Sequence, residues 1–384
     1  MSEHCVPLIS DLRHARSDLP PGSRKEPDAR FGTRVRRGNL QETPVWWAPV
    51  EAVREILAGE ERFGMTRALF VRQGHGPLLT PDDLPFHANA VLNPGLAIVG
   101  DETVLLLRIE DRQGLSQIRV ARSYNGIDGW RIADRPLLEP DLPDFPYEEW
   151  GCEDARVTQI GESLWIIAYT AYSCYGPAVA LATTEDFETV ERLGIVLSPS
   201  NKDATLFPYP FDGEWVMLHR PVTGGQEHIW HATADHDFYH WSRPGVLLPE
   251  RGGPWWDGLR IGGGAPPILT DEGWLLIYHG VKEMAGHPIY RLGVALLDRD
   301  NPRRVLARAS EWVFAPETDY EQRGLVPNVV YTCGAIRRGD EVWMYYGAAD
   351  TVIGLAIAQV SDLLTFVREK DYLSRIGLEK GMEP

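Results

Sequence analysis

The sequence has few cysteines and no long apolar run, and both absences narrow the class of protein. Its four cysteines, Cys5, Cys152, Cys174 and Cys333, are scattered without Cys-x-x-Cys spacing, which argues against a disulfide framework and against a zinc site. No stretch approaches the roughly 18 consecutive apolar residues of a membrane-spanning helix. The opening segment MSEHCVPLISDLRHARSDLPPG also lacks the apolar stretch of a signal peptide. We therefore expect a cytoplasmic protein with no metal site.

Positive charge is also scarce. The chain has 38 Lys and Arg against 55 Asp and Glu, which gives a formal net charge of -17. Such a charge repels a phosphate backbone or an anionic lipid surface at long range, so we expect neither nucleic acid nor a membrane as a partner. A local basic pocket for a small anion remains compatible with this balance.

Aromatic residues, by contrast, are abundant. The 384 residues include 13 Trp and 14 Tyr, and 43% are hydrophobic, so the chain is expected to be globular. Residues 1–45 are rich in Pro, Gly and Arg and are predicted to form an irregular arm. Residues 46–85 are predicted to hold a short amphipathic helix, near Val50 to Leu57, and the lead-in to the next domain. This arm and helix offer a surface on which a second copy of the chain could pack, so a homo-oligomer is compatible with the sequence.

One strand pattern recurs five times from residue 86 onward. Each copy begins with a turn residue, continues as an apolar run and ends in a polar or aromatic tip, and each lies between two further strand-like runs. Five in-phase triplets predict an all-β fold, a five-bladed β-propeller over residues 86–384. A pair of β-sandwiches is the alternative. The five copies are DETVLLLRIED, GESLWIIAYTA, DGEWVMLHRP, EGWLLIYHGV and GDEVWMYYGAAD.

Polar residues cluster where these strands begin and end. In a propeller the start of each first strand and the tip of each second strand meet at one rim, so these residues are predicted to converge on a ligand site. Aromatic rings with carboxylates and amides suit a sugar, and the cations indicate an anion such as phosphate. The predicted rim residues are Asn93, Arg108, Glu110, Glu153, Asp154, Arg156, Tyr169, Tyr172, Lys202, Asp203, His219, Arg220, Tyr278, His279, Asn328, Tyr346 and Asp350.

Asp154 is the best candidate for an acid among these carboxylates. Successive strand residues point to opposite faces, so Asp154 shares a face with Arg156, whereas Glu153 is predicted to pack against the sheet. An inverting hydrolase needs two carboxyl groups about 6.5 to 9.5 Å apart, whereas a phosphate nucleophile needs no base. A neighbouring Arg156 lowers the pKa of Asp154, which opposes an acid's role. We hypothesise that bound phosphate or sugar offsets this charge.

Several motifs together resemble glycoside hydrolase family 130. They run in order from about Phe86 to Val360 and include LNPGLAI, GCEDARVTQIGE, SPSNKDATLFP, MLHRP, IGGGAPPI and YYGAADTVIGLA. The resemblance implies a five-bladed β-propeller. It also implies inverting phosphorolysis of β-mannosides, such as manno-oligosaccharides or mannosyl-glucose and mannosyl-N-acetylglucosamine, to give α-mannose 1-phosphate.

The resemblance also assigns roles to residues. Asp154 is implied to be the general acid, with its proton reaching the glycosidic oxygen through a hydroxyl of the mannosyl unit. Inorganic phosphate is the implied co-substrate and no cofactor is expected. The implied phosphate contacts are Lys202, His219 and Arg192, with Arg156 added from its place beside Asp154. The expected sugar contacts are Asn93, Arg108, Asp203, Tyr278, His279 and Asp350.

Two departures from the family pattern keep alternatives open. Ala155 stands where the Glu-Asp-x-Arg motif usually has Pro, and Ala178 stands where some phosphorylases have a phosphate-binding Arg. Because loss of phosphate ligands marks the hydrolases of the family, an inverting β-mannosidase is the second hypothesis. A carboxylate such as Glu110, Asp203 or Asp350 would then activate water. A non-catalytic glycan-binding propeller is the third, since fold alone does not fix function.

Overall fold

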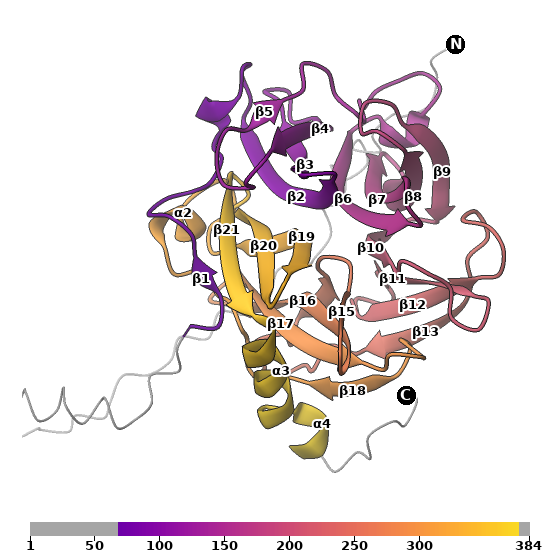
Figure 1. The fold of residues 1–384 in the computed structure, drawn as a ribbon, viewed down its shortest axis with the longest axis vertical. Coiled ribbons are helices and arrows are strands. Elements are labelled where there is room, and N and C mark those ends of the chain that lie inside the picture. The colour runs from indigo at the N-terminus through magenta and orange to yellow at the C-terminus, as the bar shows by residue number, and fades with distance from the viewer. Residues whose placement is uncertain (1–67, 376–384) are drawn as a thin grey trace, which may run out of the picture. The chain divides into compact units, whose positions relative to one another are not determined.

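The structure, a computed structural model, describes residues 68–375, and this part of the chain is nearly all β (Figure 1). It contains 21 strands, which form four sheets, and a few short helices. The predicted all-β class is therefore confirmed. The predicted arm and the helix near Val50 to Leu57 lie outside the described residues.

The largest sheet has eight strands, which form two antiparallel groups of four. The groups are joined by a single parallel pairing, between Ser116 and Gly151. The first group is β2 (Ala90–Val99), β3 (Glu102–Glu110), β4 (Ser116–Ser123) and β5 (Arg131–Ile132), and the second is β6 (Gly151–Ile160), β7 (Leu164–Ser173), β8 (Gly176–Thr184) and β9 (Glu191–Leu197).

The next two sheets are antiparallel and follow the same meander. In the first of them, β10 (Asn201–Leu206), β11 (Trp215–Pro221), β12 (Ile229–Ala234) and β13 (Ser242–Leu248) pair in chain order. In the second, β14 (Arg260–Gly263) and β15 (Ile268–Thr270) both pair with β16 (Gly273–Met284), which is followed by β17 (His287–Leu297) and β18 (Val305–Arg308).

The last sheet joins the two ends of the described chain. It consists of β19 (Val330–Arg338), β20 (Glu341–Ala348) and β21 (Val352–Gln359), with β1 (Val71–Arg72) antiparallel to β21. Arg72 fixes β1 there, because its Nε donates a hydrogen bond to the buried Glu321 carboxylate at 2.7 Å. The sequence pattern did not predict β1, because two residues are too few to show the alternation of apolar and polar side chains that marks a strand.

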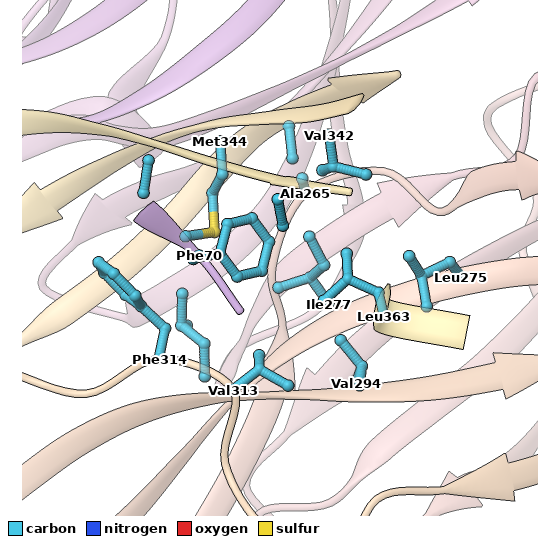
Figure 2. Packing of buried hydrophobic residues seen from close by; sticks show 14 of the residues in the cluster. Phe70, Ala265, Leu275, Ile277, Val294, Val313, Phe314, Val342, Met344 and Leu363 are labelled. Atoms are coloured by element: carbon cyan, nitrogen blue, oxygen red, sulfur yellow. The ribbon is translucent and has the colours of Figure 1, made fainter. Parts of the chain in front are cut away.

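The helices are short. They are η1 (Pro81–Asp83), η2 (Pro146–Glu148), α2 (Asp319–Gln322), α3 (Val360–Glu369) and α4 (Tyr372–Arg375). In α3, Val360, Leu363, Leu364 and Val367 are buried, at the spacing of one helix face. Figure 2 shows Leu363 of α3 beside Ile277 of β16 and Val294 of β17, in a cluster that also includes Val342 and Met344 of the last sheet. This helix therefore covers the core at the C-terminal end.

The first strands of the five groups contact one another in turn. β2 contacts β6, β6 contacts β10, and β10 contacts β14. β19 contacts β15 and β17 of the fourth group and also β2 of the first group. The first strands therefore lie next to one another, and the candidate site is built where they begin.

Candidate active site

Three of the first strands carry the same irregularity at the same place. The pairing of β2, β6 and β10 with their neighbours shifts register between Leu92 and Gly95, Glu153 and Arg156, and Lys202 and Thr205. One residue in each shift has a left-handed backbone: Asn93 at φ 45°, Asp154 at φ 52° and Asp203 at φ 58°. Residues other than glycine rarely adopt this backbone conformation, and such strained positions are concentrated at functional sites. Each bulge turns a polar side chain into the shared interior.

Asp154 is buried, with 3% of its surface exposed, and its carboxylate is held by two neighbouring strands. Its Oδ1 accepts hydrogen bonds from Asn93 Nδ2 at 2.9 Å and from Arg108 Nη1 at 3.0 Å. Burial alone raises the pKa of this carboxyl group, but Arg108, then Lys202 and Arg156, bring the pKa below its usual value. The Asp154 side chain therefore lies in a cationic surrounding.

Arg108 also binds the neighbouring carboxylate. Its Nη2 donates to Glu153 Oε1 at 2.9 Å while its Nη1 donates to Asp154. Both carboxylates thus face one guanidinium, so the prediction that strand alternation separates Glu153 from Asp154 is wrong. The physical reason is the bulge, because it inserts a residue and breaks the alternation of side chains.

Asp203 forms the second buried anionic point of the site. Its Oδ2 accepts a hydrogen bond from Arg220 Nε at 2.6 Å, and its Oδ1 accepts one from Tyr331 Oη at 2.6 Å. The Nε2 atom of His279 lies 3.6 Å from the same carboxylate. Burial favours the neutral form, but the charge of Arg220, together with those of Arg156 and Lys202, outweighs it and holds the pKa of Asp203 well below its usual range. Asp203 therefore stays ionised.

Arg156 lies beside Asp154 in the sequence but points away from the carboxylate. Its Nη1 donates to the Asp154 backbone carbonyl at 2.9 Å, and its Nε and Nη2 donate to the carbonyls of Gly264 at 2.7 Å and Gly263 at 2.9 Å. Its Nη2 also donates to Tyr331 Oη at 2.9 Å. With 1% of the side chain exposed, its donors are taken up by protein acceptors on its own strand and on neighbouring groups of strands. The structure thus gives Arg156 protein partners at each donor nitrogen, an arrangement that favours a structural role over the predicted contact with phosphate.

Gly264 is required where it stands. A methyl group there would lie 2.6 Å from the Ile277 carbonyl oxygen, closer than side-chain carbons approach backbone oxygens. The glycine-rich run IGGG is therefore a place of close backbone packing around Arg156 rather than a phosphate loop.

Lys202 and His219 supply polar groups without protein partners. Lys202 Nζ makes no hydrogen bond or ion pair with residues 68–375, although its charge lowers the pKa of both Asp154 and Asp203, among other causes. His219 Nδ1 lies 3.1 Å from Asn201 Oδ1, while its buried Nε2 has no hydrogen-bond partner. Burial lowers the pKa of His219 to about 4. A neutral imidazole bonded to Asn201 Oδ1 through Nδ1–H leaves Nε2 as an acceptor for a protonated ligand oxygen.

Asp350 follows β20 and completes the group of carboxylates. It adopts a left-handed backbone with φ 49°. Burial raises the pKa of Asp350 to about 6, and the Asp154 charge adds to this while Arg108 opposes it. These interactions bring Asp350 into the same electrostatic surrounding as Asp154.

His279 lies between Asp203 and two aromatic rings. Its ring is 4.7 Å from that of Tyr331 and 6.0 Å from that of Tyr290, measured between centroids. Burial lowers the pKa of His279 to about 3, so the imidazole is neutral at ordinary pH. Its buried Nδ1 has no hydrogen-bond partner.

Two of the residues assigned to phosphate or sugar contacts lie elsewhere. Arg192, on β9, donates to Glu148 Oε2 at 3.0 Å and to the Glu139 carbonyl at 3.0 Å, and within residues 68–375 it makes no hydrogen bond to Asp154 or Lys202. Tyr278 points away from its neighbour His279, because strand residues alternate. Its Oη donates to Asp257 at 3.1 Å and its ring stacks on Trp256. Neither is brought to the Asp154 group.

The sequence interpretation missed Tyr331 and Asn201 as members of the site. Tyr331 binds Asp203 and Arg156, and Asn201 orients His219. Both occupy starts of first strands, the position that held the predicted residues, so the repeat offered a signal for them.

Within residues 68–375 no group of three or more His, Cys, Asp or Glu side chains has the arrangement of a metal site. No helix in the same range is long and apolar enough to cross a membrane.

The fold and the site together define a class of protein. The site combines buried carboxylates, amides and tyrosines with a lysine that has no partner among the described residues. Such a combination is typical of enzymes that act on sugars and small anions. The family model of glycoside hydrolase family 130, described as beta-1,4-mannooligosaccharide phosphorylase, matches residues 78–369. The chain belongs to glycoside hydrolase family 130. The predicted family is confirmed, and with it the predicted enzyme class, a glycoside phosphorylase.

Known relatives carry phosphorylase names. Beta-1,2-mannobiose phosphorylase of Listeria innocua is 41% identical over 252 residues, 65% of this chain and 68% of the relative. Beta-1,4-mannooligosaccharide phosphorylase of Ruminococcus albus is 30% identical over 308 residues, 77% of this chain and 90% of the relative. The solved structure of the Listeria enzyme with beta-1,2-mannobiose is similar with a TM-score of 0.72 and 33% identity, over 78% of this chain and 99% of that one.

Proposed function

We propose that this enzyme cleaves β-mannosides by inverting phosphorolysis and releases α-mannose 1-phosphate. The observation that carries the proposal is the Lys202 ammonium group, which has no protein partner in the described chain although it lies close enough to lower the pKa of Asp154. In a chain with a net charge of -17, an unpaired cation beside the candidate acid is suited to a small anion. The phosphorylase names of the relatives support the same reaction.

The reaction is a single displacement. A phosphate oxygen held by Lys202 and His219 attacks the anomeric carbon of the mannosyl unit from the face opposite the leaving sugar. The bond from that carbon to the glycosidic oxygen breaks as the new C–O bond forms, so the configuration inverts. Asp154 supplies the proton that the leaving oxygen takes up, relayed by a hydroxyl of the mannosyl unit. The site needs no carboxylate base, because phosphate is already an anion.

The low pKa of Asp154 must rise for this role. The sequence interpretation attributed the lowering to Arg156, but the guanidinium that binds the carboxylate is that of Arg108. We propose that bound phosphate offsets the charges of Lys202 and Arg108 and so restores the proton to Asp154. Phosphate binding and the protonation of Asp154 would then be coupled, because the negative charge of bound phosphate raises the pKa of the Asp154 carboxyl group.

The remaining site residues are proposed to hold the sugar. Asn93 and Arg108 already touch Asp154, and His279 lies 3.6 Å from the carboxylate of Asp203. Carboxylates, amides and imidazoles are the groups that bind sugar hydroxyls. Asp350, whose carboxyl group responds to the same charges, is proposed as a fifth contact.

We also propose that the five groups of strands close into a five-bladed β-propeller. The contacts of the first strands run from β2 through β6 and β10 to β14, and β19 returns to β2. The pairing of β1 with β21 adds a strand from the start of the described chain to the last group. A cytoplasmic location and a homo-oligomer remain proposals of the same kind.

Hydrolysis is the second candidate function, and two residues favour it. A general base works best with a pKa near the working pH, and burial raises the pKa of Asp350 to about 6. The buried Ala178, where some family phosphorylases have a phosphate-binding arginine, points the same way. An inverting β-mannosidase would use Asp350 to activate water.

Substitution of Lys202 tests the phosphate site. Lys202→Met removes a charged hydrogen-bond donor, so the KM for phosphate should rise about 10- to 100-fold, while the KM for the mannoside changes far less. Lys370→Met is the matched control, since Lys370 is paired with Glu311 at the end of α3. An unchanged phosphate KM in Lys202→Met would remove this residue from the phosphate site.

A further inference from the structure

Large aromatic side chains are exposed at one end of the second group of strands. We call Tyr147, Trp150, Tyr172 and Tyr175 the aromatic rim. Tyr147 is 49% exposed, Trp150 41% and Tyr175 65%. The rings of Trp150 and Tyr172 meet edge to face at 5.4 Å, and those of Tyr147 and Tyr175 lie 6.3 Å apart. The four rings thus form two pairs rather than isolated surface residues.

The aromatic rim lies where β6, the strand that carries Asp154, begins and where β7 ends. The Trp150 backbone N–H donates to the Tyr172 carbonyl at 2.9 Å, and Gly151 is opposite Tyr172 in the β6–β7 pairing. Tyr175 lies in the turn between β7 and β8, at the same end of the sheet. Asp154 follows Trp150 by four positions along the chain, about 13 Å at the usual rise of a strand. The rim is therefore a continuation of the site, beyond the reach of groups bound directly at Asp154.

The chemistry of the rim fits a carbohydrate. An exposed aromatic ring leaves apolar area in water, and a sugar ring offers an apolar face to cover it. The phenol groups of Tyr147, Tyr172 and Tyr175 make no hydrogen bond with residues 68–375, so they are available to sugar hydroxyls. Tyr and Trp are suited to such surfaces because each combines an apolar body with a polar tip.

We infer that the aromatic rim binds the distal mannosyl units of a β-manno-oligosaccharide, those beyond the leaving unit next to Asp154. The inference rests on the proposed function, because it takes the chain bound at Asp154 to be a mannoside. It follows that the enzyme prefers oligosaccharides to disaccharides, and that the side chains of the aromatic rim cause this preference.

The ratio of kcat/KM for a β-mannotetraose to kcat/KM for the β-mannobiose of the same linkage, measured with phosphate, tests the inference. The wild-type ratio should exceed one, and Trp150→Ala and Tyr175→Ala should each lower it about two- to tenfold. Tyr239→Ala is the matched control: Tyr239 is 51% exposed and lies in the β12–β13 connection, at the opposite strand ends. An unchanged ratio in both rim variants would overturn the inference, and so would an equal loss on both substrates.

Calorimetric binding of the same two sugars without phosphate separates this inference from the proposed function. Tighter binding of the tetraose that is lost in Trp150→Ala and Tyr175→Ala supports the rim even if no mannose 1-phosphate forms. A wild-type enzyme that forms mannose 1-phosphate but binds both sugars equally supports the proposed function and overturns the rim.

Discussion

Asp154 combines a strained backbone, deep burial and two charged or amide donors on one oxygen. Asp154→Asn keeps the acceptor oxygen for Asn93 and Arg108 but removes the transferable proton. Since positioned general acids contribute about 10²- to 10⁴-fold, kcat/KM for phosphorolysis should fall by about that factor. Mannoside binding, measured by calorimetry, and the thermal unfolding midpoint should change little. A variant that keeps a tenth of the wild-type activity would contradict the assignment.

Asp350 provides a test by pH. Burial raises the pKa of its carboxyl group to about 6 in the folded protein, against about 4 in an unfolded chain. The folded state thus holds a proton that the unfolded state has lost, so the contribution of Asp350 to stability is full below about pH 4 and is lost as pH rises through 6.

Asp350→Asn cannot ionise and avoids this loss. Between pH 4 and pH 7.5 its free energy of unfolding should therefore gain about 1 to 3 kcal/mol relative to wild type. Urea unfolding at both pH values, followed by tryptophan fluorescence, measures the difference. An equal gap at the two pH values would show that the Asp350 carboxyl group titrates normally.

Single residues were predictable where the repeat fixed their position. Asn93, Asp154 and Asp203 stand at the starts of first strands, and the structure brings Asn93 and Arg108 to Asp154 as the shared rim required. The orientation of Arg156 was not predictable, because a local alternation rule cannot foresee a bulge that needs pairing with a distant strand. Arg192 was taken from the resemblance alone, and its partner Glu148 lies 44 residues away in the sequence.

At the scale of elements, Arg156 ties the bulge of β6 to two other groups of strands. Its guanidinium ties the Asp154 carbonyl on β6 to Gly263 on β14 and to Tyr331 on β19. Arg156→Lys keeps the charge but cannot reach all of these acceptors with one ammonium group. Unsatisfied buried acceptors cost about 1 to 3 kcal/mol each, so chemical denaturation should show a loss of about 2 to 4 kcal/mol. We expect kcat to fall with it, while the KM for phosphate stays close to wild type.

Arg308→Lys is the matched control for this prediction. Arg308 is equally buried and donates to the Pro249 carbonyl and to Asp257, within the fourth group of strands and its connections. It should lose similar stability but keep kcat at a temperature where the protein is folded. If Arg156→Lys raised the phosphate KM tenfold instead of lowering kcat, Arg156 would belong to the phosphate contacts after all.

Some elements could be read from the sequence and others could not. The five apolar runs predicted the second strands because each is a continuous buried run with turn residues on both sides. Helix α3 was missed although Val360, Leu363, Leu364 and Val367 carry its period, since the strand β21 runs directly into it without a turn residue. Strand β1 is set by pairing with β21 and by Arg72, and both are tertiary effects.

At the scale of the whole molecule, the meander explains why one site can draw on all five groups. Each first strand contacts its neighbours, so short polar side chains at the strand starts meet although they are far apart in the sequence. Asp203 and Tyr331, 128 residues apart, share a hydrogen bond of 2.6 Å. The repeat made this convergence predictable, whereas the ion pairs among the converging residues depend on side-chain directions that only the folded chain shows.

The central claim is that phosphate, not water, is the nucleophile at Asp154. Phosphorus and proton NMR of the full-length enzyme with β-mannobiose, recorded with and without inorganic phosphate, tests it most directly. We expect α-mannose 1-phosphate and mannose in equal amounts when phosphate is present, and no cleavage when it is absent. Release of two mannose molecules at the same rate in both samples would contradict the account and identify the enzyme as a hydrolase.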